Sequence, residues 1–242
     1  MTADLRLSVD ISGLLTRKGY ALVEGDAFAA SPQAQADLAW LRHRFGALPL
    51  DRRLPDGGTY RYRRHGRFRV LVDPVTHRSE VAYLGPPATG GAGCEHAPLG
   101  PGLESNRFLT ALLRCNVAHL PPSPGWDVDV HLVRVTATPG RIGKPSPGGP
   151  HRDGVDFVSL HLVDLSGASV GGVVEVRTPD GELVLSTRLT GRLDSLFLND
   201  RVLLHDVTPL AAVVGTAHYD TLLIGYRVTR PDETHPDTVH TG

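Results

Sequence analysis

A histidine and an aspartate stand two residues apart near the middle of the chain, as His151 and Asp153 in SPGGPHRDGVDFV. They lie between a Gly/Pro-rich loop and an apolar run, a place where catalytic groups tend to sit. In an extended segment, side chains i and i+2 point to the same side, so an imidazole and a carboxylate can meet there. A second histidine, His205, ends a later apolar run in NDRVLLHDVTPL. The three predict a two-His-one-carboxylate site, which leaves open coordination positions on Fe(II).

An H-x-D pair by itself also occurs by chance, so the prediction depends on the fold. The fold must bring His205 close to the pair although the two lie far apart in the sequence. After Trp126 the chain consists of short runs rich in Val and Leu, separated by the turns PDG, TGR and NDR. The runs are VDVHLVRVTA, FVSLHLVDL, GVVEVRT, ELVLSTRL, DSLFL, RVLLHDV and DTLLIGYRV. This spacing favours a double-sheet jelly roll over alternating βα units. Strands far apart in sequence meet at the mouth of a jelly roll, which would bring His205 to His151.

The first half of the chain has helical patterns. One short helix is expected to end near Gly19, and a second has Ser31 as N-cap, Pro32 at its first position and Gly46 at its end. A third is expected in ESNRFLTALLRCNVAHL, before PPSPG. The alternating segment YRYRRHGRFRVLVD predicts a strand or hairpin.

These patterns predict a mainly β protein with flanking helices (α+β) and a double-stranded β-helix core of the cupin-like, jelly-roll type. We expect one domain over residues 1–242. In it, residues 1–125 supply helices and pocket strands that buttress the barrel, 126–230 form the core, and 231–242 are a polar tail.

Bulk composition narrows the function classes. The 242 residues are 40% hydrophobic and 21% charged, as in an ordinary globular protein. A net charge of -1 supplies no basic field for nucleic acid, and no run of about 18 apolar residues predicts a membrane-spanning helix. The N-terminus is a poor signal peptide, and the two cysteines, Cys94 and Cys115, are too few for a disulfide framework. We therefore expect a cytoplasmic protein that binds neither nucleic acid nor membrane.

The sequence resembles the Fe(II)/2-oxoglutarate-dependent dioxygenases, and most closely the bacterial branch that contains hydroxylases of free L-isoleucine and related amino acids. The resemblance runs roughly from Tyr60 to Arg227. It is carried by RYRRHGRF, VHLVRVTATPG, PGGPHRDGVDFV, GGVVEVRTPDG, LNDRVLLHDVTP and YDTLLIGYR. It implies a double-stranded β-helix, iron on the three residues above, and 2-oxoglutarate and O2 as co-substrates. Where the family shows an arginine before the aspartate that opens the last strand, this chain has Tyr219.

The resemblance also implies a cation for the distal carboxylate of 2-oxoglutarate. A planar, bidentate arginine suits that role better than lysine, and Arg227 on the last strand is our candidate, with Arg134 next. The alternative for Arg227 is a residue that only caps the strand. Thr208 could add a hydroxyl donor, or could simply support the turn at Pro209.

A free amino acid needs an arginine for its carboxylate, and the best pocket candidates are Tyr60, Arg61 and Tyr62. Their alternative is a solvated basic face on an edge strand. Arg134 shares strand parity with Val128, Val130 and Leu132, so it is a further candidate, and if it points inward it should meet an anion. His161 is interpreted as structural. The remaining histidines are interpreted as surface or packing residues: His43, His65, His77, His96, His119, His131, His218, His235 and His240.

These predictions combine into a dioxygenase that hydroxylates a C–H bond of a free, small L-amino acid and releases succinate and CO2. The carboxylate at Asp153 argues against halogenation, which in related enzymes requires a small residue there. Desaturation or ring closure at the same site is an alternative, and so is a non-catalytic, cupin-like module that binds a metal and a small ligand. A nucleic-acid or protein demethylase is disfavoured because the chain has no basic stripe with stacking aromatics. The oligomeric state stays open.

Overall fold

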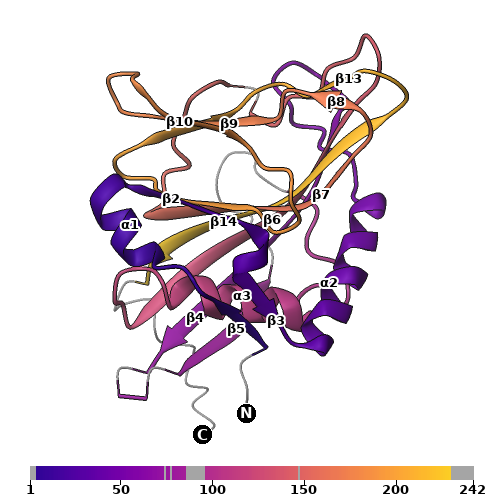
Figure 1. Cartoon of the computed structure of the whole chain (residues 1–242). Coiled ribbons are helices and arrows are strands. Elements are labelled where there is room, and N and C mark those ends of the chain that lie inside the picture. The colour runs from indigo at the N-terminus through magenta and orange to yellow at the C-terminus, as the bar shows by residue number, and fades with distance from the viewer. Residues whose placement is uncertain (1–3, 74, 77, 86–95, 147, 230–242) are drawn as a thin grey trace, which may run out of the picture.

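The structure is a computed structural model that describes residues 4–73, 75–76, 78–85, 96–146 and 148–229 (Figure 1). The expected polar tail, Cys94 and part of the loop before Pro98 lie outside the described residues. No helix in these ranges is long and apolar enough to cross a membrane.

A large antiparallel sheet forms the centre of the molecule, with the strand order β2-β11-β7-β14-β6-β4-β5. Its strands are β2 (Tyr20–Val23), β4 (Arg61–Val72), β5 (Ser79–Gly85), β6 (Gly125–Ala137), β7 (Phe157–Ser166), β11 (Ser195–Asn199) and β14 (Ala217–Val228). Strand β4 pairs with β6 from Arg61 to Leu71, but with β5 only from Arg67 onward. On the side away from β6, isolated bridges join Tyr62 to Leu50 and His65 to Pro98. The arginine-rich segment therefore forms the strand that its alternation predicts.

A smaller sheet covers one face of the large one, as Figure 1 shows. It has the order β10-β9-β12, and a two-stranded β8–β13 pair lies beside it. These strands are β8 (Ser169–Val170), β9 (Val173–Arg177), β10 (Leu183–Arg188), β12 (Leu204–Val207) and β13 (Ala211–Ala212). Buried side chains from both layers, including Val158, Val174 and Leu196, form one apolar cluster between them. The mainly β fold with a jelly-roll core is confirmed.

Within the described ranges, three helices cover the opposite face of the large sheet (Figure 1). They are α1 (Ile11–Lys18), α2 (Pro32–Arg44) and α3 (Arg107–Val117). Helix α1 ends at Gly19, whose φ of 77° gives the left-handed cap that a glycine allows. Ser31 caps α2 as expected, and α2 continues into a 3-10 turn, η2 (Phe45–Ala47), that contains Gly46. Short strands β1 (Leu5–Leu7) and β3 (Phe28–Ala30) pair with each other, and η1 (Gly25–Ala27) precedes β3.

The two faces of the large sheet carry different side chains because strand residues alternate. On β6, Val133 and Val135 face the small sheet, while Val130 and Leu132 belong to the cluster under the helices. The register places Arg61 opposite Val135 and Arg63 opposite Val133. Both arginines therefore point into the space between the sheets.

Candidate metal centre

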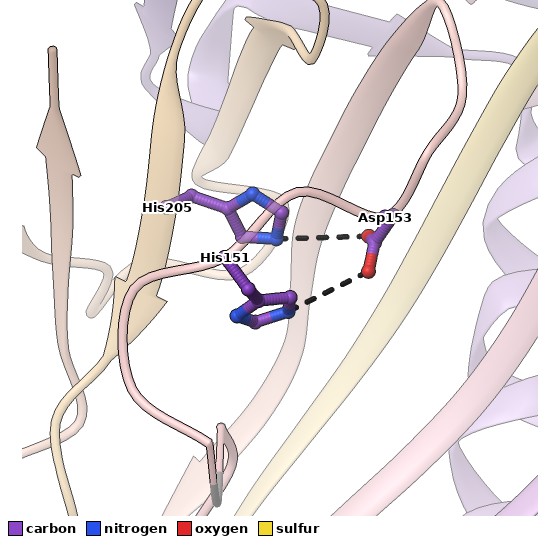
Figure 2. Close-up of side chains that lie close together, drawn as sticks. All are labelled: His151, Asp153 and His205. Carbon is purple, nitrogen blue, oxygen red and sulfur yellow. Dashed lines mark ion pairs between the residues drawn. The ribbon is translucent and has the colours of Figure 1, made fainter. Parts of the chain in front are cut away.

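Two imidazoles and one carboxylate converge at one end of the space between the sheets (Figure 2). The distance between His151 Nε2 and Asp153 Oδ1 is 3.5 Å, and that between His205 Nε2 and Asp153 Oδ2 is 3.6 Å. Adjacent ligands of an ion bound at about 2.1 Å lie about 3 Å apart. A small inward movement of the side chains would give a facial set of two nitrogens and one oxygen, which suits Fe(II).

The convergence of the two histidines comes from an isolated antiparallel bridge. His151 and His205 exchange both backbone hydrogen bonds, each 3.0 Å from nitrogen to oxygen. Residues directly opposite in such a pair project to the same side, and the two ring centroids are 4.6 Å apart. Asp153 lies in the loop after the bridge, so the expected alternation along a strand does not position it. That detail of the sequence interpretation was wrong.

A buried carboxylate, Asp200, positions Asp153 instead. Its side chain is fully buried and accepts three backbone N–H groups, from Asp153 at 3.1 Å, Gly154 at 2.8 Å and Val155 at 3.1 Å. Its Oδ1 also lies 3.8 Å from Nδ1 of His205. Asp200 therefore connects the loop of one ligand to the ring of another. Sequence reasoning assigned NDR to a turn and gave Asp200 no role. The available signal for Asp200 was an acidic residue shortly before the strand that carries His205.

Hydrogen bonds, neighbouring charges and burial act on the protonation of the three residues. His151 Nδ1 lies 2.8 Å from the carbonyl of Gly149, to which it can donate, so Nε2 is left to face Asp153. The interaction with Asp153 raises the pKa of His151, whereas burial lowers that of His205. Burial pushes the pKa of Asp153 upward, but the neighbouring histidines hold it below its ordinary value. Asp153 is therefore a carboxylate near neutral pH.

The three residues line a cavity of about 270 Å³ between the two sheets. This volume is below the roughly 300–1,000 Å³ of clefts for drug-sized ligands, so the cavity suits small molecules. Its apolar wall consists of Val133, Val135, Val158, Leu160, Val174, Leu196, Leu198, Val207 and Leu223. Arg61 and Arg63 are its cations among the described residues, and Tyr219, Thr221 and Ser146 add hydroxyls.

Comparison with known proteins gives the fold and the site a family. Residues 42–225, most of the chain, match the family described as 2OG-Fe dioxygenase. The chain belongs to this family. It is thus a 2-oxoglutarate-dependent, non-haem iron dioxygenase, which uses Fe(II), 2-oxoglutarate and O2. The donor set of His151, Asp153 and His205 fits that ion, and the orphaned Nδ1 of His205, buried without a hydrogen-bond partner among the described residues, faces Asp200.

Individual relatives agree with this assignment. The dioxygenase is similar to 3(1)-hydroxy-L-isoleucine 4-dioxygenase of Pantoea ananatis (strain AJ13355), with 23% identity over 88% of this chain and 93% of that protein. It is 33% identical to L-isoleucine-4-hydroxylase of Bacillus thuringiensis, over 41% of each chain. Among solved structures, IDO from Bacillus thuringiensis superposes with a TM-score of 0.75 at 20% identity, covering 91% of this chain and 94% of that one. A bsmA homolog from Methylobium petroleophilum PM1 gives 0.72 at 28% identity, covering 94% and 96%.

Of the three substrate candidates Tyr60, Arg61 and Tyr62, Arg61 reaches the cavity of the dioxygenase. Arg61 lines the wall, with Nε and Nη2 at 3.0 and 2.9 Å from Oδ2 of buried Asp51. The Tyr60 hydroxyl instead bonds to the Asp56 carboxylate at 2.9 Å. Tyr62 packs against the cluster under the helices, on the other face of the sheet.

The structure places three other candidates outside the cavity wall. Arg134 faces the helices, where it makes a bidentate ion pair with Asp220 at 2.7 and 2.6 Å. Arg227 has the strand parity of the cavity-lining Leu223, but it lies beyond the cavity, 48% exposed, and pairs with Asp129 at 2.6 Å. Thr208 Oγ1 accepts the backbone N–H of Val173 at 3.0 Å, so it stabilises the small sheet. None of the three is positioned to hold a ligand in the cavity.

Sequence reasoning missed a basic cluster beside the metal centre. Arg63 lines the cavity and donates from Nε to Nδ1 of His131 at 3.1 Å, and the His131 ring stacks on His65 at 3.9 Å. Burial, and secondly the charge of Arg63, lower the pKa of His131 and bring that of His96 to about 4. These two imidazoles are therefore neutral near pH 7. The alternation of arginines in RYRRHGRF was the available signal.

Proposed function

We propose that this dioxygenase hydroxylates a C–H bond of a free, small L-amino acid and converts 2-oxoglutarate to succinate and CO2. The observation that carries the proposal is a metal centre that opens into a small, apolar-walled cavity with two arginines. The printed names of the two curated relatives, which refer to isoleucine and hydroxyisoleucine, support the same substrate class.

The cavity wall suits a free aliphatic amino acid, which carries a carboxylate and an apolar side chain. Arg61 and Arg63 bring guanidinium groups to the wall, and Asp51 holds the orientation of Arg61. The valine and leucine side chains of the wall suit the apolar part of such a substrate.

The chemistry divides between the bound groups and the chain. Fe(II) with 2-oxoglutarate and O2 supplies the oxidant that attacks the C–H bond. The triad fixes the ion at one end of the cavity, and the valine and leucine wall excludes water and positions an aliphatic side chain. Arg63 lines the cavity, and in this proposal it orients the substrate carboxylate through a forked ion pair.

A panel of free amino acids, each with its decarboxylated analogue, tests this proposal. The Fe(II)-loaded protein is incubated with 2-oxoglutarate and O2, and succinate and product mass are measured. We expect succinate release and a product heavier by one oxygen atom with an aliphatic amino acid, and neither with its analogue. A product lighter by two hydrogens would indicate desaturation or ring closure, and 2-oxoglutarate left intact throughout would indicate a binding module.

A further inference from the structure

Two rows of side chains cross the floor of the cavity, from β4 through β6 to β14. Strand register aligns Arg61, Val135 and Tyr219 in one row. Arg63, Val133 and Thr221 form the next. Each row has a guanidinium at one end, a valine in the middle and a hydroxyl at the other end. The end strands are about 10 Å apart, so the two polar groups of a row can approach one carboxylate from opposite sides.

The hydroxyl of Tyr219 lacks a partner for its hydrogen. Tyr219 is 2% exposed, lines the cavity, and its hydroxyl has no hydrogen-bond partner among the described residues. A buried hydroxyl without a partner is unfavourable and rare in folded proteins. Burial raises the pKa of Tyr219, so the group is a neutral donor. Its natural partner is an acceptor on the molecule that fills the cavity.

The Arg61 row lies one pleat further from the metal ligands than the Arg63 row. The charge of Arg63 contributes to the low pKa of Asp153. Arg61 Nη1 instead donates to the carbonyl of Pro145 at 3.3 Å, and the next residue, Ser146, accepts the N–H of Val207, two residues beyond His205. Successive same-face residues on a strand are separated by about 7 Å. A 2-oxo acid that chelates the ion would extend its distal carboxylate, two methylene groups away, toward this second row.

We propose that Tyr219 and Arg61 bind the distal carboxylate of 2-oxoglutarate, an inference that rests on the proposed function of the cavity. Tyr219 donates a hydrogen bond to one carboxylate oxygen. Arg61 supplies the positive charge, and its buried ion pair with Asp51 holds its orientation. Co-substrate specificity would then depend on a tyrosine–arginine pair on β14 and β4, and not on Arg227.

The test compares two 2-oxo acids on the Fe(II)-loaded protein without oxygen. 2-Oxopentanoate has the chain length of 2-oxoglutarate but lacks the distal carboxylate. Removing a hydrogen bond to a charged group weakens binding by about ten- to a hundredfold. We therefore expect Tyr219→Phe to weaken 2-oxoglutarate binding by that factor, with 2-oxopentanoate and Fe(II) affinities and Tm unchanged. Arg227→Gln, outside the cavity, is the matched control and should bind 2-oxoglutarate like the parent.

Arg61 needs a second variant because Arg61→Met would leave the Asp51 carboxylate buried and unpaired. The double variant Arg61→Met/Asp51→Asn removes both charges and should lose the same preference for 2-oxoglutarate. Unchanged 2-oxoglutarate affinity in Tyr219→Phe would overturn the proposal and leave an ordered water as the partner of the hydroxyl. Equal losses for both 2-oxo acids would also overturn it. If the parent protein binds no 2-oxoglutarate, both the proposed co-substrate and the role of the Arg61–Tyr219 row are wrong.

Discussion

Two clusters of histidine and aspartate lie on opposite faces of the large sheet. His151, Asp153 and His205 lie on the side of the small sheet, and Asp164, His218 and Asp220 on the side of the helices. In each cluster, one ligand atom from every residue lies within 4.8 Å of the others. By residue type and spacing, both could hold a metal ion.

The two clusters differ in their counter-charges. We call His151, Asp153 and His205 the inner cluster, and Asp164, His218 and Asp220 the outer cluster. In the outer cluster, Arg42 pairs with Asp164 at 2.7 Å and Arg134 forms a bidentate ion pair with Asp220. His218 lies between the two carboxylates, at 3.2 Å from Asp164 and 3.7 Å from Asp220. A metal ion there would have to displace two guanidinium groups. Among the described residues, Asp153 has ion pairs with histidines alone, so only the inner cluster leaves a carboxylate for a cation and a cavity for its ligands.

The largest effect should come from removing a ligand of the inner cluster. We expect His151→Ala, Asp153→Ala and His205→Ala each to abolish turnover and to weaken Fe(II) binding severely, with the fold retained. His218→Ala in the outer cluster should leave the Fe(II) stoichiometry unchanged. Metal titration and succinate release measure both, and normal Fe(II) binding with full activity in any inner variant would disprove the assignment.

Replacing an arginine on the cavity face should affect substrate binding, whereas replacing one on the helix face should affect stability. Arg63→Gln removes the cation beside the metal centre, so the KM for the amino acid should rise by about 30-fold or more, because losing one partner of a buried charge pair removes roughly 2–5 kcal/mol. Arg134→Gln leaves Asp220, 1% exposed, without its partner, so it should lower Tm and leave that KM unchanged. A KM change in Arg134→Gln alone would reverse the assignment of the faces.

A smaller effect is expected at Asp200, which positions the ligands without touching the ion. Asp200→Asn weakens the acceptor of three backbone N–H groups and the charge facing His205. Outer partners of metal ligands typically contribute about 10- to 100-fold in affinity or activity. We expect a loss of that size in Fe(II) affinity and a changed visible spectrum of the Co(II)-substituted protein. Glu182→Gln, an exposed acidic residue in the turn between β9 and β10, is the control and should change neither.

The smallest effect concerns a histidine that has no carboxylate partner in the described part of the chain. His161 is buried among Ser159, Ser195 and Asn116, and burial lowers its pKa to about 3. The unfolded chain takes up this proton near pH 6.5, so the contribution of neutral His161 to stability is complete above pH 6.5. It is lost as the pH falls toward 3, by about 1.4 kcal/mol per pH unit. Denaturant unfolding at pH 7.5 and 5 should show a weaker pH dependence in His161→Gln than in the parent. Equal pH dependence would contradict the prediction.

Local pattern was sufficient for the strands, the helix caps and the candidate metal ligands. Short runs of Val and Leu bounded by turns predict strands wherever they pack, and Ser31 caps its own helix through neighbouring backbone groups. The H-R-D segment and His205 stand out because few residue types ligate Fe(II). Asp200 was not found, since its partners are backbone groups that any sequence would supply.

The sequence by itself determined the β-rich architecture and the choice of His151, Asp153 and His205 as candidate metal ligands. Only the tertiary structure decided which arginines reach the cavity. Both faces of the large sheet are covered, one by the small sheet and the other by helices. Strand β6 therefore carries buried apolar side chains on both faces, and its alternation does not identify the cavity side. Sequence parity therefore predicted that Arg134 faces the cavity, whereas it faces the helices. Arg227 has the parity of the cavity-lining residues but lies beyond the cavity. Strand register decides this, and it also brings Arg61 and Tyr219 into the cavity wall.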